Sequence, residues 1–71
     1  MIKISVLIAG QHATSISLED EFFQEFINIA KEKNLSRNEL VTIIDRERTV
    51  DNLSSAIRLY VLKYYKDKAK D

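Results

Sequence analysis

The sequence predicts a mainly helical protein with a short β-strand, which is an α+β fold. Two periods carry this prediction: residues 14–19 alternate in polarity, whereas from residue 19 onward apolar side chains recur every three or four positions. Residues 1–71 are expected to form one domain. Because a chain of this size buries only about 60% of the surface that its unfolded form exposes, oligomerisation is the expected source of further stability.

The strand is expected at residues 13–18. Its period of two places Thr14, Ile16 and Leu18 on a core face. One strong strand in so small a chain needs a sheet partner, and a second copy of the chain is the most economical one. The opposite face looks toward solvent or a ligand and holds Ala13, Ser15 and Ser17.

Residues 1–9 can hold an additional strand, because residues 4–9 are mostly apolar and rich in β-branched side chains. Gly10, the only glycine, marks with Gln11 a turn, bulge or kink before the second strand. The pattern leaves open whether residues 1–9 extend the two-stranded ribbon that two copies of strand 13–18 would form, or pair as a separate edge strand.

Three helices are expected after the strand. The first covers residues 19–33, with aromatic and aliphatic side chains on one face. The second covers residues 37–48, and Ser36 followed three residues later by Glu39 is a capping box at its start. The third covers residues 53–68 and carries an apolar stripe wide enough to indicate burial on more than one side. A dimer interface explains this width best, although a compact monomer core could absorb part of it.

Composition excludes several function classes. The chain has no cysteine and one histidine, so no thiolate or closed metal site is expected, and no cofactor. His12 is interpreted as a surface loop residue, because no nucleophile or carboxylate accompanies it, and the protein is not expected to be an enzyme. No apolar run approaches about 20 residues, which predicts a cytoplasmic protein with no membrane partner.

The order of elements resembles the ribbon-helix-helix family, to which the Arc-type and methionine repressors belong, and more narrowly a bacterial subgroup of ribbon-helix-helix domain proteins. The third helix is additional to the basic pattern. The resemblance implies an intertwined homodimer in which the two copies of strand 13–18 pair into an intermolecular antiparallel two-stranded ribbon. It is carried by Gly10 and by residues 14–19, 22–23, 29–30, 35–36, 40–41, 44–45 and 52–62.

The resemblance further implies that the ribbon enters the major groove of double-stranded DNA. The base-facing residues would then be Ala13, Ser15 and Ser17. Related sequences usually carry a basic residue at the position of Ala13, so weak base readout is expected here. The family also holds a phosphate at the start of the second helix, which corresponds to Ser36, Arg37 and Asn38.

The favoured function is therefore a dimeric DNA-binding protein that regulates transcription. The alternative is a ribbon-helix-helix scaffold that serves as a protein–protein interaction module, with little or no DNA binding and a protein partner. On residue type alone, Ser15 and Ser17 could equally form an ordinary solvent-facing strand surface. Asp45 is expected to fix a helix or the Arg58 side chain, and the three tyrosines are expected to pack in the core or an interface.

Overall fold

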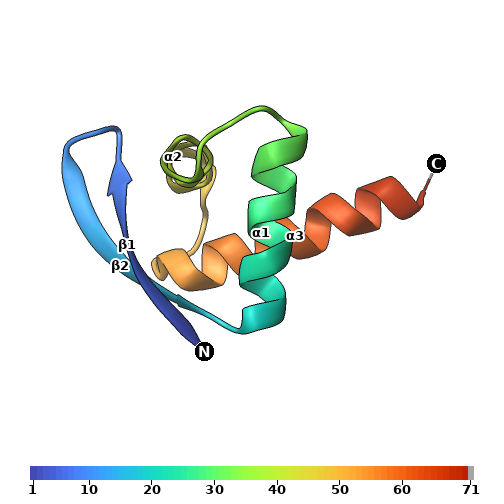
Figure 1. Cartoon of the computed structure of the whole chain (residues 1–71). Helices are drawn as coiled ribbons and strands as arrows, with labels where there is room; N and C mark the ends of the chain where they lie inside the picture. The colour runs from blue at the N-terminus through green and yellow to red at the C-terminus, as the bar shows by residue number, and fades with distance from the viewer. Residues whose placement is uncertain (71) are drawn as a thin grey trace.

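A computed structural model describes residues 1–70 of the chain. A β-hairpin lies to one side of three helices, and all three helices lie on the same side of the hairpin (Figure 1). The helices begin and end within one or two residues of the expected positions. In chain order the elements are β1 (Ile2–Ile8), β2 (His12–Leu18), α1 (Asp20–Glu32), α2 (Arg37–Glu47) and α3 (Leu53–Ala69).

The two strands pair antiparallel within one chain, with Ile4 opposite Ile16 and Val6 opposite Thr14. The turn between them has a positive φ at both Ala9 (54°) and Gly10 (70°). Positive φ at two successive turn residues matches the right-handed twist of paired strands, and glycine adopts it without steric cost. The expectation that the second strand finds its sheet partner in a second copy is therefore wrong for one edge of β2, since β1 already occupies that edge.

Local signals account for the helix boundaries. The Ser36 hydroxyl accepts a 3.1 Å hydrogen bond from the Glu39 amide, and the Glu39 carboxylate accepts a 2.7 Å bond from the Ser36 amide, so the expected capping box is confirmed. Helix α1 ends where Asn34 adopts a positive φ of 58°, which lets the Leu35 amide donate to the carbonyl of Ala30. At α3 the Asn52 side chain caps the first turn.

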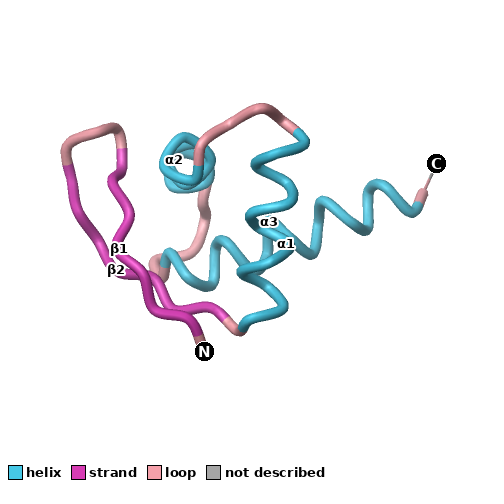
Figure 2. The backbone as a smooth tube through the Cα atoms, viewed as in Figure 1, coloured by secondary structure: helices cyan, strands magenta, loops and turns pink. Residues whose placement is uncertain are grey.

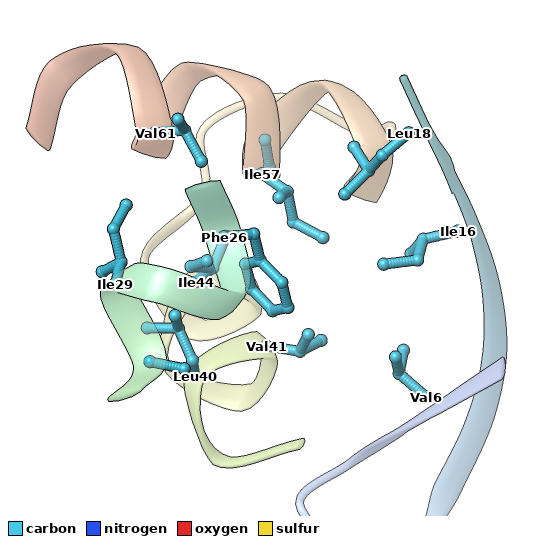
Figure 3. Packing of buried hydrophobic residues seen from close by; sticks show 12 residues of the cluster. Val6, Ile16, Leu18, Phe26, Ile29, Leu40, Val41, Ile44, Ile57 and Val61 are labelled. Carbon is cyan, nitrogen blue, oxygen red and sulfur yellow. The ribbon is translucent and has the colours of Figure 1, made fainter. Parts of the chain in front are cut away.

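The core fills the space between the hairpin and the helices. Val6, Ile16 and Leu18 point from the strands toward Phe26 and Ile57 (Figure 3). No polar or charged side chain of residues 1–70 is buried, so burial in this core requires no compensating hydrogen bonds from side chains. The buried set is Val6, Ile16, Leu18, Phe26, Ile29, Ala30, Leu40, Val41, Ile44, Ala56, Ile57 and Val61.

Helix α3 is longer than the body that supports it, and its last turns project away from the other elements (Figure 2). Two side-chain contacts with α1 nevertheless reach these last turns: the Tyr65 hydroxyl donates a 2.7 Å hydrogen bond to the Glu25 carboxylate, and the Lys68 ammonium lies 2.9 Å from the Glu32 carboxylate. Leu59 and Leu62, on another part of its surface, remain 52% and 53% exposed.

Candidate nucleic-acid interface

The outer face of the hairpin is not covered by any helix. The burial pattern confirms the predicted faces of β2, because Ile16 and Leu18 are buried while Ala13 and Ser15 are exposed. Ser17 points to the same outer face but is partly covered. Strand β1 adds a second row to this face, consisting of Lys3, Ser5 and Leu7.

The two rows meet in directly opposed pairs: Lys3 with Ser17, Ser5 with Ser15, and Leu7 with Ala13. Two hydroxyls therefore lie side by side at the centre of the face, and an ammonium group lies at one end. No ion pair within residues 1–70 involves Lys3.

Lys3 and Ser5 are not among the predicted site residues, because the pattern of residues 1–9 predicts an additional strand and no binding face. Their signal was the alternation in Ile2-Lys3-Ile4-Ser5-Val6, which is interrupted only by Leu7.

The outer edge of β2 is sealed at one end and open at the other. The Ser17 amide donates a 3.0 Å hydrogen bond to the Ser54 hydroxyl, and the Ser17 carbonyl accepts a 3.1 Å bond from the guanidinium of Arg58. The backbone amide and carbonyl of Ser17 thus point away from β1. Because these directions alternate along an antiparallel strand, the amides and carbonyls of Ala13 and Ser15 point away from β1 as well. No hydrogen bond from a helix of the described chain reaches the backbone of these two residues, so they form an open edge.

The outer edge of β1 is occupied near the turn by helix α2. The Leu7 amide donates a 3.1 Å hydrogen bond to Oδ1 of Asn38, and the Ala9 amide donates a 2.9 Å bond to the hydroxyl of Thr42. These bonds satisfy edge amides that would otherwise be free to pair with another strand. They also place the N-terminus of α2 beside β1, on the side of the sheet away from β2.

The three residues expected to hold a phosphate therefore lie together at this edge, but they differ in what they can offer. The hydroxyl of Ser36 is engaged in the capping box, and the side chain of Asn38 bonds to β1. The amides of Arg37 and Asn38 precede the first bond of the helix, from the Leu40 amide to the Ser36 carbonyl, and so have no helical acceptor. The side chain of Arg37 is exposed.

A carboxylate also lies at this helix start. The hydrogen bonds that Glu39 accepts from Ser36 favour its charged form and lower the pKa of its carboxyl below the ordinary value. Part of the positive end of the helix is therefore already balanced by a negative charge. An anion at this site would depend on the amides of Arg37 and Asn38 and on the guanidinium of Arg37.

Arg58 joins three elements at the end of β2. Its Nε donates a 2.7 Å hydrogen bond to the carboxylate of Glu19, in addition to the bond that its Nη2 makes with Ser17. The hydrogen bond from Arg58 is the main reason that the pKa of the Glu19 carboxyl is lowered. Asp45 of α2 instead pairs, at 2.9 Å, with Arg48, the residue that follows this helix, so of the two roles expected for it the structure supports fixing the helix end and not Arg58.

The remaining candidate residues are the three tyrosines and His12. Tyr60 and Tyr64 pack partly buried against the core, in agreement with the expected packing role. Tyr65 does not, since it is 38% exposed and its hydroxyl donates to Glu25 at the surface. His12 is exposed at the first residue of β2, and not in a loop as expected. Within residues 1–70 there is no cluster of side chains that could hold a metal ion.

The chain is a two-stranded antiparallel ribbon followed by helices that cover only its inner face, and the outer face is mostly polar. This arrangement places it among small proteins that combine a β-ribbon with packed helices. No helix within residues 1–70 is long and apolar enough to cross a membrane.

A comparison with models of protein families matches residues 1–65 to the family described as "Ribbon-helix-helix domain". The protein belongs to this family. The match begins before β1 and continues into α3, so both the first strand and most of the third helix lie within the family's domain. No curated protein and no solved structure matches the chain.

Proposed function

We propose that the protein is a DNA-binding regulator of transcription, acting as a homodimer in the cytoplasm. The observation that carries this proposal is the uncovered polar face of the hairpin in a member of a family whose domains commonly bind DNA. The face carries three hydroxyls and one ammonium beside Ala13 and the half-exposed Leu7, and these polar groups suit hydrogen-bonding to DNA.

The open edge of β2 supports a dimer that forms by strand pairing. The free backbone groups of Ala13 and Ser15 allow an antiparallel register in which Ala13 of one chain lies opposite Ser15 of the other, and Thr14 lies on the two-fold axis. In this register each of the two residues both donates and accepts a hydrogen bond across the interface. A register centred on Ser15 would instead require the groups of Ser17, which α3 already occupies.

The paired β2 strands then form the ribbon that enters the major groove, which is about 12 Å wide and accepts two strands. Ala13, Ser15 and Ser17 would face the base edges. Serine hydroxyls both donate and accept, so they discriminate less among bases than an arginine on guanine or an asparagine on adenine. We therefore expect low sequence selectivity from direct contacts.

The start of α2 is the proposed phosphate contact. The free amides of Arg37 and Asn38 would donate to a phosphate oxygen, and the Arg37 guanidinium would add a formal charge. Ser36 would contribute by fixing the first turn through its capping box.

The alternative function, a protein–protein interaction module, is favoured by one observation. The exposed Leu59 lines a groove between α2 and α3 together with Ile44, Val50 and Tyr60, and the exposed Leu62 follows three residues later on α3. Exposed leucines next to an apolar groove are typical of a surface that binds another protein. DNA binding and a partner on this surface exclude each other only if the partner covers the hairpin.

A charge-reversal experiment tests the DNA-binding proposal. Ser15→Glu with Ser17→Glu places carboxylates against phosphates and base acceptors, so binding to a duplex should be lost while the protein stays dimeric. The control Gln24→Glu with Thr49→Glu adds the same charge at two exposed positions away from the hairpin and should bind nearly as the wild type does.

Fluorescence anisotropy with a pool of random-sequence duplexes would measure binding, and sedimentation would measure the dimer. Unchanged binding by the hairpin variant would contradict the proposed interface. Loss of the dimer in that variant would show that the outer face takes part in the dimer interface, which contradicts its assignment to DNA.

A further inference from the structure

We propose that β1 flanks the DNA-reading ribbon on each side and that Lys3 contacts the phosphate backbone along the walls of the major groove. This inference rests on the proposed function, because it assumes that the paired β2 strands enter the groove. It assigns a role to the strand that lies outside the ribbon, and to the one cation of the hairpin's outer face.

The width of the sheet gives the first argument. Since β1 pairs with β2 inside each chain, pairing of β2 across a dimer produces a sheet of four strands in the order β1, β2, β2, β1. Neighbouring strands lie about 4.8 Å apart, so each β1 runs roughly 7 Å from the two-fold axis. The groove extends only about 6 Å to either side of its centre, so β1 lies over the phosphates that border it.

The chemistry of the outer face gives the second argument. Lys3 is exposed, points to the same face as Ser15 and Ser17, and lies directly opposite Ser17. No carboxylate of the described chain pairs with it, so its charge is available to a ligand. An ammonium on a flexible stem suits phosphate, which it contacts as a point charge. Lys3 thus supplies a positive charge to the outer face, where the uncharged Ala13 supplies none.

The position of α2 gives the third argument, independent of Lys3. The hydrogen bond from the Leu7 amide to Asn38 fixes the N-terminus of α2 at the outer edge of β1 and not at the edge of β2. The proposed phosphate contacts of Arg37 and Asn38 are therefore on the same flank as Lys3. Lys3 and Leu7 are four positions apart in β1, which is about 13 Å at the usual strand rise. The flank thus spans several phosphates of one DNA strand.

Ser5 lies between these two points and faces the same way. Its hydroxyl can donate to a phosphate oxygen or to a bridging water. Lys3 nevertheless dominates the expected effect, because only a charged contact releases a counterion from DNA.

The salt dependence of DNA binding tests this inference. A dimer carries two copies of Lys3, and each phosphate neutralised adds about 0.9 to the slope of log affinity against log salt. Lys3→Ala should therefore lower the magnitude of the slope by about 1.8. It should also weaken binding at low salt, and the loss of affinity should be nearly the same for every DNA sequence. Lys3→Arg should keep the slope of the wild type. Lys66→Ala, which removes an exposed charge from the projecting part of α3, is the matched control and should change neither quantity.

The outcomes separate the two proposals. If the wild type fails to bind any duplex at low salt, the proposed function and this inference both fail. If the wild type binds and Lys3→Ala leaves the slope unchanged while the variant melts at the wild-type temperature, only the inference fails. If Lys3→Ala changes which sequences are preferred, Lys3 reads bases, and its assignment to the phosphates is overturned.

Discussion

Truncation of two neighbouring residues of β1 measures whether this strand packs as the structure shows. Val6 is 1% exposed and points into the core, whereas Leu7 is 42% exposed and points to the outer face. Val6→Ala removes two methyl groups from a site closed by the strands and helices. At about 0.8 kcal/mol for each buried carbon, with a further cost for the cavity left behind, we expect a loss of about 2 kcal/mol.

Leu7→Ala removes more atoms but from a half-exposed site, so we expect a loss below about 1 kcal/mol. For a domain of this size, 1 kcal/mol shifts the melting temperature by about 4–8 °C, so Val6→Ala should melt roughly 8–16 °C below the wild type. Urea unfolding at two protein concentrations would give both free energies and reveal any coupling to dimer formation.

Because a slip of one residue moves every side chain of a strand to the other face, a larger loss for Leu7→Ala than for Val6→Ala would refute the register. Equal and negligible losses would refute the packing of β1 altogether.

Three further predictions concern contacts within one chain. Because the pKa of Glu19 is lowered in the folded state, its bond to Arg58 stabilises the fold fully above the unfolded pKa of this carboxyl. This stabilisation is lost as the pH falls through the lower, folded pKa. The free energy of unfolding of Arg58→Met, measured against pH, should therefore lack this loss. Asn38→Ala should speed hydrogen exchange at the Leu7 amide, measured by NMR, because that amide loses its acceptor. Ala9→Gly should raise the free energy of unfolding by up to about 1 kcal/mol in urea, because glycine relieves the positive φ, and a loss of stability would contradict this reasoning.

Several features could be predicted from the sequence because each has a local cause. The alternation in residues 13–18 predicted which side chains of β2 face the core, and burial of Ile16 and Leu18 confirms it. The spacing of Ser36 and Glu39 predicted a capping box, whose two hydrogen bonds are present. Such signals depend on neighbours within four residues, so no tertiary information is needed to interpret them.

The sequence predicted a possible strand in residues 1–9 and a turn at Gly10, but not that this strand pairs with β2 within one chain, because the signals of the hairpin are weak. Its turn uses Ala9 and Gly10, whereas the common signal for such a turn is asparagine or aspartate before glycine. Leu7 on the outer face also obscures the alternation of β1. The partner of Arg58 depends on three elements that meet only in the folded chain, so sequence spacing could not distinguish Glu19 from Asp45.

The salt dependence of wild-type binding to a random-sequence duplex tests the central claim most directly. With Lys3 and Arg37 from each chain neutralising phosphates, a dimer makes about four charged contacts. Log affinity should then fall linearly with log salt at a slope near −3.6. Absence of binding at the lowest salt concentration, or an affinity that does not change with salt, would contradict a role of this hairpin in contacting DNA.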